Sequence, residues 1–296
     1  MKVITLSCSS LTARIAPELG SNMFSFTYKN HELIFSDNKT LEKGGFTGTY
    51  VLFPTPNRVK DFVYTWQGKQ YTLQKNEKKV HIHHQLVFDQ PFQILRSDRS
   101  SVTTSITIDK HSHLFAGFPF PCTLTLQYRL RSDGIHIQYT VTNLGNEALP
   151  FGFGLHPHFR RLSGDDKTLI SIPATSVMDT ISDTLLPNGK LTPVRPLHQT
   201  PVGELSLDHA FTNIQPRRYA TIDYKREKFN VVLKTSNDFT HIVVWTGHPK
   251  AICIENQTCS ADAHNLWARG FKKESHLLTV APGKSRTGYI EYVISS

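Results

Sequence analysis

Apolar and polar side chains alternate in short runs along most of this chain, and helical periodicity is scarce. This pattern is typical of β-strands, because successive side chains point to opposite faces of a sheet. The longest runs are 101–108, 122–131 and 134–143, and Ser132-Asp133-Gly134 between the last two is a strong hairpin turn. The pattern therefore predicts an all-β fold of antiparallel strands.

Shorter runs extend this prediction to the rest of the chain. Residues 37–49 contain three glycines and are expected to form a loop, whereas 261–269 are expected to contain a turn of helix. Further strands are expected at 11–15, 23–28, 64–66, 70–73, 80–87, 168–172, 219–223, 229–234, 241–245, 251–255, 276–280 and 286–293.

The chain has 296 residues, of which 39% are hydrophobic, and this suffices for a large core. No linker, low-complexity segment or internal repeat divides it, so we expect residues 1–296 to form a single β domain. The N-terminus lacks the apolar run of a signal peptide, and no stretch reaches the ~18 apolar residues of a membrane helix. The four cysteines form no CxxC pair. These features predict reduced thiols and a cytoplasmic protein without a membrane partner.

A formal net charge of +9 raises the question of nucleic acid. The basic clusters are short, are interrupted by acidic residues and lie between strand-like segments, where solvated loops usually carry lysine. We therefore expect no nucleic-acid partner. The positive balance is compatible with an anionic sugar phosphate as substrate, with Lys60, Arg160 or Arg161 near the phosphate. Nothing in the sequence indicates an oligomeric state.

The stretch Pro150–Arg160 concentrates residue types that catalysis uses. His156 and His158 can exchange protons near neutral pH, because free imidazole has a pKa of about 6.5. Three phenylalanines can exclude water, and Gly152 and Gly154 allow close approach of a ligand. The alternative is an ordinary buried strand with packed or surface histidines.

Two other segments hold candidate polar groups. Pro54 and Pro56 follow an apolar run, so Arg58 would project from a rigid loop, although an ordinary surface arginine fits this position equally well. The short apolar strand that begins at Ala251 reaches Glu255. That carboxylate is either exposed at the strand end or held in a cleft.

The order of short motifs along the chain resembles the aldose 1-epimerase (galactose mutarotase) family over nearly the whole length. Each motif is weak alone, and their shared order is specific. They are Pro56-Asn57-Arg58-Val59, Trp66-Gln67-Gly68-Lys69-Gln70-Tyr71, Phe118-Pro119-Phe120-Pro121, Leu155-His156-Pro157-His158-Phe159, Leu207-Asp208-His209-Ala210-Phe211, Cys253-Ile254-Glu255-Asn256-Gln257-Thr258 and Val280-Ala281-Pro282-Gly283-Lys284-Ser285.

The resemblance implies a β-supersandwich that interconverts the α and β anomers of an aldohexose such as free galactose or glucose. It implies that His156 is the general acid and Glu255 the general base, and that Arg58, His83 and Asp208 hold sugar hydroxyls. Such a reaction opens and recloses the pyranose by proton transfer and needs no metal, nucleotide or other cofactor. Its one expected partner is the small-molecule aldose.

Three positions depart from the usual pattern of the family. His158 stands where relatives commonly carry tyrosine, His84 where a glycine often follows the binding histidine, and Asn256 where a proline often follows the base. The first two departures bear on substrate choice.

Three alternatives remain open at this stage. One is a hexose-6-phosphate 1-epimerase. Another is a metalloenzyme that uses the pairs His81/His83, His111/His113 and His156/His158, although Pro157 is expected to disturb strand alternation in the last pair. The third is a non-catalytic sugar-binding domain that stacks sugars on Trp66, Trp245 and Trp267, although a binding domain needs no matched acid and base.

Overall fold

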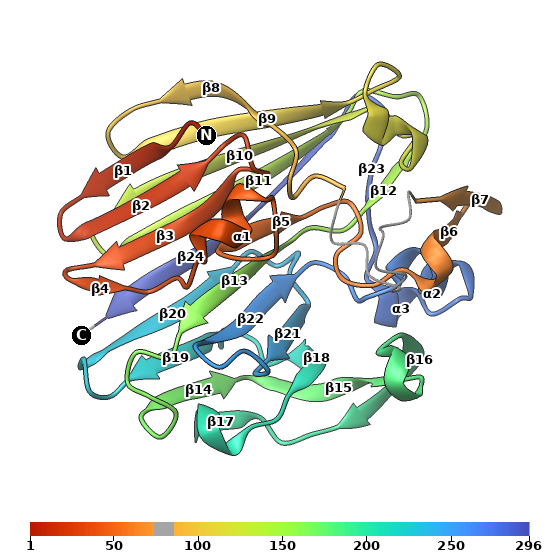
Figure 1. Ribbon diagram of the computed structural model, residues 1–296. Coiled ribbons are helices and arrows are strands. Elements are labelled where there is room, and N and C mark those ends of the chain that lie inside the picture. The colour runs from red at the N-terminus through yellow and green to blue at the C-terminus, as the bar shows by residue number, and fades with distance from the viewer. Residues whose placement is uncertain (74–85, 296) are drawn as a thin grey trace.

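The computed structural model describes residues 1–73 and 86–295, and its chain is built mainly of antiparallel strands (Figure 1). The larger sheet contains, in spatial order, β17 (Leu197–Pro201), β14 (Thr168–Ile172), β19 (Ala220–Tyr224), β20 (Phe229–Thr235), β24 (Ser285–Ser295), β11 (Gly134–Asn143), β10 (Cys122–Arg131), β9 (Ser101–Ile108) and β8 (Gln93–Ser97).

The second sheet has seven strands and carries most of the candidate site residues. Its spatial order is β16 (Pro187–Pro193), β15 (Ala174–Thr180), β18 (Asp208–Ile214), β21 (His241–Trp245), β22 (Ala251–Gln257), β13 (Gly154–Arg160) and β5 (Thr49–Leu52). Figure 1 shows β13 and β22 side by side, and β13 lies next to the edge strand β5.

Smaller elements complete the described part of the chain. A four-stranded sheet is formed by β1 (Ile4–Cys8), β2 (Leu11–Ala16), β3 (Asn22–Tyr28) and β4 (His31–Glu32), and two strand pairs by β6 (Val63–Trp66) with β7 (Lys69–Thr72) and β12 (Leu149–Phe151) with β23 (Leu278–Val280). The helices are α1 (Asn38–Glu42), α2 (Ala263–Ala268) and α3 (Lys272–Ser275), with 3-10 turns η1 (Lys60–Phe62), η2 (His113–Ala116), η3 (Ser182–Thr184) and η4 (Val202–Glu204). No helix in the described ranges is long and apolar enough to cross a membrane.

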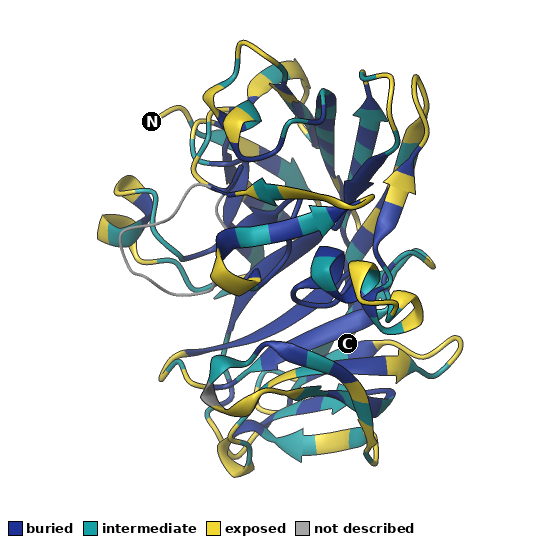
Figure 2. Ribbon diagram, turned by 90° about the vertical axis from the view of Figure 1, so that its right-hand side faces the viewer, coloured by how far each residue is buried: buried dark blue, intermediate teal, exposed yellow. Residues whose placement is uncertain are grey.

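The two large sheets pack face to face around a shared apolar core. Phe159 of β13 meets Tyr292 of β24 edge to face, with ring centroids 5.1 Å apart, and both side chains are almost fully buried. The hydroxyl of Tyr224 in β19 donates to the backbone oxygen of Arg160, 2.9 Å away. Burial of one such aromatic side chain contributes about 1.5–3 kcal/mol to stability. Figure 2 shows this interior in dark blue, with the exposed residues mainly in turns and edge strands.

The predicted strands at 101–108, 122–131, 134–143, 168–172 and 241–245 coincide with β9, β10, β11, β14 and β21. These strands are easy to predict because most of their residues alternate between the core and the opposite face. The structure thus confirms the all-β antiparallel fold.

Other expectations were wrong in detail. The expected loop 37–49 contains α1, which begins where the Asp37 carboxylate accepts a hydrogen bond of 2.8 Å from the Thr40 amide. The expected strand 276–280 is shorter, because α3 extends to Ser275 and β23 starts at Leu278. Most of the expected strand 80–87 lies outside the described residues, and its last two positions are not in a strand.

Pro157 does not disturb the alternation of β13, contrary to expectation. Gly154 pairs with Gln257 and His158 with Cys253 in one unbroken register, although proline cannot donate to the ladder. Register is kept because β5 supports the other side of β13, where Pro157 lies opposite Thr49. His156 and His158 consequently share one face of the sheet, with ring centroids 5.0 Å apart.

Candidate functional site

Strand alternation separates the core from a polar face on β13 and β22. On β13, Leu155 and Phe159 point into the apolar core, so His156 and His158 point to the opposite side. On β22, Ile252 and Ile254 belong to the core, and Cys253, Glu255 and Gln257 therefore share the polar face.

The closest polar contact on this face joins His156 and Glu255. Nε2 of His156 lies 3.0 Å from Oε1 of Glu255, and the two residues are 8% and 2% exposed. The other carboxylate oxygen, Oε2, accepts a hydrogen bond of 2.9 Å from Nε2 of Gln257. Both oxygens of the candidate base are thus held in fixed directions, which is what a positioned proton acceptor requires.

Burial changes the acid–base behaviour of His156. It lowers the pKa of the imidazole well below the 6.5 of the free group, while the negative charge of Asp208 acts in the opposite direction. The near-neutral pKa expected from the residue type is therefore not retained in the unliganded protein. Tyr50 of β5 covers the ring in a stacked arrangement, with centroids 4.5 Å apart.

Arg58 is presented by a tight loop that follows β5. Asn57 adopts a left-handed conformation with φ of 63°, which asparagine tolerates, and its Oδ1 accepts a 2.8 Å hydrogen bond from the Arg58 amide. The Arg58 backbone oxygen in turn accepts from the Asp262 amide at 2.7 Å. Hydrogen bonds thus hold both the backbone N–H and the backbone oxygen of Arg58. This agrees with the rigid loop that the two prolines predicted.

Asp208 lies at the start of β18 and faces Arg58. Nη2 of Arg58 is 3.9 Å from Oδ2 of Asp208, and the aspartate side chain is 41% exposed. Burial raises the pKa of Asp208, whereas the charge of Arg58 lowers it. A separation of 3.9 Å is longer than a hydrogen bond, so both groups keep hydrogen-bonding capacity for a ligand.

These residues line one pocket of about 420 Å³. Such a volume is within the usual range of small-molecule sites. Its walls combine aromatic rings with hydrogen-bonding groups, and the lining residues are Phe46, Tyr50, Asn57, Arg58, His156, His158, Asp208, Val243, Trp245, His248 and Glu255.

The pocket brings together four of the five predicted site residues: Arg58, His156, Asp208 and Glu255. The fifth, His83, lies outside the described residues, as does His84. His158, the departure from the family pattern, belongs to the pocket lining.

Sequence reasoning missed several residues of the site. Gln257 could have been found, because it lies two positions after Glu255 and a strand puts such residues on one face. Tyr50 is opposite His156 across two strands, a pairing that no local pattern shows. Phe46 and His248 belong to loops, and their sequence context carries no signal of the pocket.

Of the three tryptophans considered as stacking platforms, Trp245 lines the pocket. Trp66 and Trp267 instead lie against each other, with ring centroids 6.1 Å apart, and Trp66 is buried. Of the two His-x-His pairs in the described ranges, His156 and His158 line the pocket, whereas His111 and His113 are exposed and do not. His81 lies outside the described residues.

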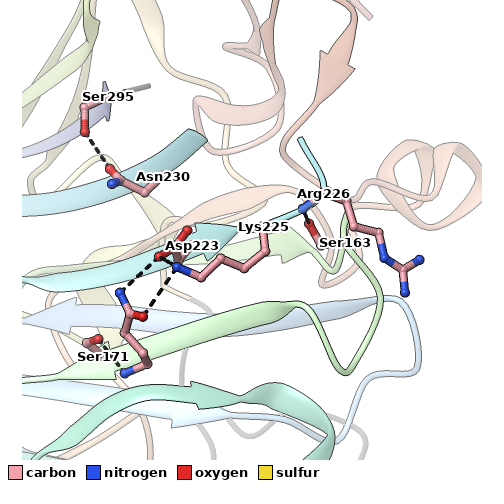
Figure 3. A network of polar contacts seen from close by, with 8 residues as sticks. Ser163, Ser171, Asp223, Lys225, Arg226, Asn230 and Ser295 are labelled. Carbon is pink, nitrogen blue, oxygen red and sulfur yellow. Dashed lines mark hydrogen bonds and ion pairs between the residues drawn. The ribbon is translucent and has the colours of Figure 1, made fainter. Parts of the chain in front are cut away.

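A larger hollow of about 510 Å³ lies against the outer side of the nine-stranded sheet, along β14, β17 and β19. Its carboxylate, Asp223, is engaged by Lys225 at 2.6 Å and by the side chain of Gln199 (Figure 3). Because this carboxylate is paired with a lysine rather than with a histidine, the hollow offers no comparable acid–base pair.

Comparison with known proteins gives one family. The model of the aldose 1-epimerase family matches residues 2–293. YihR of Escherichia coli K12, an uncharacterised protein, is 24% identical over 283 residues, which cover 90% of this chain and 89% of YihR.

Solved structures show the same fold. A galactose mutarotase-like protein of Clostridium acetobutylicum superposes with a TM-score of 0.86 at 21% identity, covering 99% of this chain and 95% of that one. A structure described as a putative aldose 1-epimerase of Escherichia coli K12 gives a TM-score of 0.82 at 20% identity, covering 99% of both chains.

Proposed function

Because the chain belongs to the aldose 1-epimerase family, we propose that it interconverts the α and β anomers of an aldohexose. The observation that carries this proposal is the contact of 3.0 Å between His156 and Glu255 inside a pocket that also contains Arg58 and Asp208. A sugar-binding domain without catalysis has no need of a buried acid–base pair.

In the proposed cycle, Glu255 accepts the proton of the anomeric hydroxyl while Nε2 of protonated His156 delivers a proton to the ring oxygen. The bond between C1 and the ring oxygen breaks, and an open-chain aldehyde forms. Rotation about C1–C2 then presents the other face of the carbonyl. Reclosure returns the proton from Glu255 to the carbonyl oxygen, and His156 regains its proton from the former ring oxygen.

The environment of His156 suits the transfer to a weakly basic ether oxygen. Burial lowers the pKa of this residue, which makes its protonated form a stronger acid than a solvated imidazolium. The carboxylates of Asp208 and Glu255 favour the protonated form when the sugar is bound. Since Nε2 contacts Glu255 in the free protein, the sugar has to enter between these two side chains.

Arg58 and Asp208 would orient the sugar in the pocket. The guanidinium only donates hydrogen bonds, so Arg58 would bind the oxygen of a sugar hydroxyl. An ionised carboxylate only accepts them, so Asp208 would bind the proton of a hydroxyl. The sequence also assigns His83 to this role, at a position that the structure does not describe.

The charges around the described pocket favour a neutral sugar over a hexose 6-phosphate. Arg58 is the one arginine or lysine in the described lining, and Asp208 partly offsets its charge. Arg161 is directed elsewhere, because Asp165 and the backbone oxygen of Thr246 accept its hydrogen bonds. Arg160 lies over the ring of Phe35.

The test is a polarimetric screen of freshly dissolved α-anomers of glucose and galactose, each with and without a 6-phosphate. We expect the free hexoses to be accelerated toward anomeric equilibrium and the phosphates to be poorer substrates. Faster turnover of a 6-phosphate would assign the hexose-6-phosphate activity instead. Binding of sugars without any acceleration would identify a non-catalytic domain.

A further inference from the structure

Three buried residues on the polar face of β13 and β22 offer the donor atoms of a soft metal site. One nitrogen or sulfur atom from each of His156, His158 and Cys253 lies within 4.8 Å of the other two. We propose that these residues bind one Zn²⁺ ion and that its binding blocks the pocket. The binding is independent of the proposed function, whereas the inhibitory consequence rests on it.

Strand pairing brings the ligands together. His158 and Cys253 are Cα partners across β13 and β22, and they lie on the face opposite to the core residues Phe159 and Ile252. His156 is two residues before His158, and its ring lies 5.0 Å from the His158 ring. All three residues are buried, so their side chains lose little conformational freedom when they coordinate an ion.

The hydrogen bond of His158 leaves one ring nitrogen available. Its Nδ1 lies 3.0 Å from the backbone oxygen of Gly48, and since a carbonyl only accepts, Nδ1 carries the proton. Nε2 of the neutral ring therefore has a lone pair. A backbone carbonyl on the second nitrogen is the usual way in which proteins orient a metal-binding histidine.

The local field favours a cation beside Cys253. Glu255 shares the polar face of β22 with Cys253, and the negative charges of Glu255 and Asp208 act on the thiol. The same two carboxylates would attract a divalent ion, which would displace the thiol proton. Two imidazoles and a thiolate suit Zn²⁺ better than Mg²⁺ or Ca²⁺, which prefer oxygen ligands, and they leave a fourth position open to water.

Occupation of this site removes the proposed general acid. A His156 nitrogen that holds a metal cannot donate a proton, and an ion bound to His156 and His158, which both line the pocket, takes space that the sugar needs. Zinc should therefore inhibit mutarotation, and chelation should not reduce it. The metal would act as a regulator or inhibitor of the site rather than as its catalyst.

The experiment titrates Zn²⁺ into metal-free, reduced protein by calorimetry and follows Co²⁺ binding by visible absorption. We expect one ion per chain, about one proton released per ion, and an absorption band that reports thiolate coordination. Cys253→Ala should abolish this band. It should also weaken Zn²⁺ binding by about 100-fold or more, because loss of an outer-shell partner alone costs 10–100-fold.

Two further variants separate a lost ligand from a damaged fold. His158→Asn places an amide donor where Nδ1 was, so it can keep the hydrogen bond to Gly48 while the Nε2 ligand is lost. It should also weaken Zn²⁺ binding. His111→Ala changes an exposed histidine away from the pocket and should leave affinity unchanged. Each variant is checked for a native thermal unfolding transition.

An unchanged Zn²⁺ affinity in both Cys253→Ala and His158→Asn, or no uptake of zinc by the native protein, would overturn the site. A separate experiment measures activity. Zinc should inhibit mutarotation by the native protein and should not inhibit mutarotation by Cys253→Ala. If the zinc-saturated native protein retains full mutarotation, the inhibitory role is wrong. If no preparation catalyses mutarotation, the proposed function fails while the binding data still decide the metal site.

Discussion

The carboxylate of Glu255 contacts His156 through one oxygen and Gln257 through the other. Oε1 faces Nε2 of His156 at 3.0 Å, whereas Oε2 accepts a hydrogen bond of 2.9 Å from Nε2 of Gln257. In the proposed cycle, a sugar enters between His156 and Glu255 and separates the first contact. The hydrogen bond from Gln257 would then keep the carboxylate in place, and we propose Gln257 as a positioning residue.

Gln257→Leu should lower kcat by about 10–100-fold with a smaller change in KM. The estimate follows from loss of a hydrogen bond to a charged group, which contributes about 1.5–3 kcal/mol. Gln257→Glu is a poorer replacement, because it puts a second carboxylate beside Glu255. Steady-state kinetics of mutarotation provide the measurement. Native kcat in Gln257→Leu would mean that Glu255 needs no such support.

Arg58→Ala and Asp208→Asn should raise KM more than they lower kcat, by about 10-fold for a single hydrogen bond. Both side chains line the pocket, and their charged groups lie 3.9 Å apart. Exposed Arg226, which pairs with Asp166 at 3.0 Å, is the matched control for loss of an arginine. A drop in kcat with unchanged KM would show that these residues act in the chemical step.

Stability should fall as pH drops below about 6.5. Burial lowers the pKa of His241 to about 3 and that of His264 to about 4, so the unfolded chain binds more protons than the folded one in this range. For each of these histidines, the free energy of unfolding then falls by up to about 1.4 kcal/mol per pH unit, between the pKa of the unfolded state and that of the folded state. Above pH 6.5 neither contributes a slope.

Thermal unfolding between pH 7.5 and pH 5 measures this effect. His264→Gln removes one titrating ring, and its midpoint should change less steeply with pH than that of the native protein. An equally steep profile in the variant would assign the acid sensitivity to other groups.

The sequence predicted most of the fold, because most strands have one face in the core. It missed β1, β8, β15 and β18 as well as β16 and β17. The segments of β16 and β17, Pro187–Pro193 and Leu197–Pro201, carry prolines and few apolar residues. Such strands lie at the edges of the two large sheets, where one side needs no partner. No alternation marks them because little of either face is buried.

For the site, the order of motifs identified residues far apart in the chain, and the structure places four of them in one pocket. Their environment could not be predicted in the same way. The lowered pKa of His156 comes from burial under Tyr50 and the rest of the wall, and this depends on how β5 pairs with β13. The proximity of Cys253 to His158 could not be predicted either, because it depends on the register between β13 and β22.

The measurement that tests the central claim is the optical rotation of freshly dissolved α-D-galactose or α-D-glucose, corrected for spontaneous mutarotation. We expect Glu255→Gln and His156→Gln each to lower the catalysed rate by about 10²–10⁴-fold with sugar binding largely retained. The double variant should be little slower than the worse single one, since groups in one step are strongly non-additive. If Glu255→Gln equilibrates the preferred sugar at the native rate, Glu255 is not the base and the proposed mechanism is wrong.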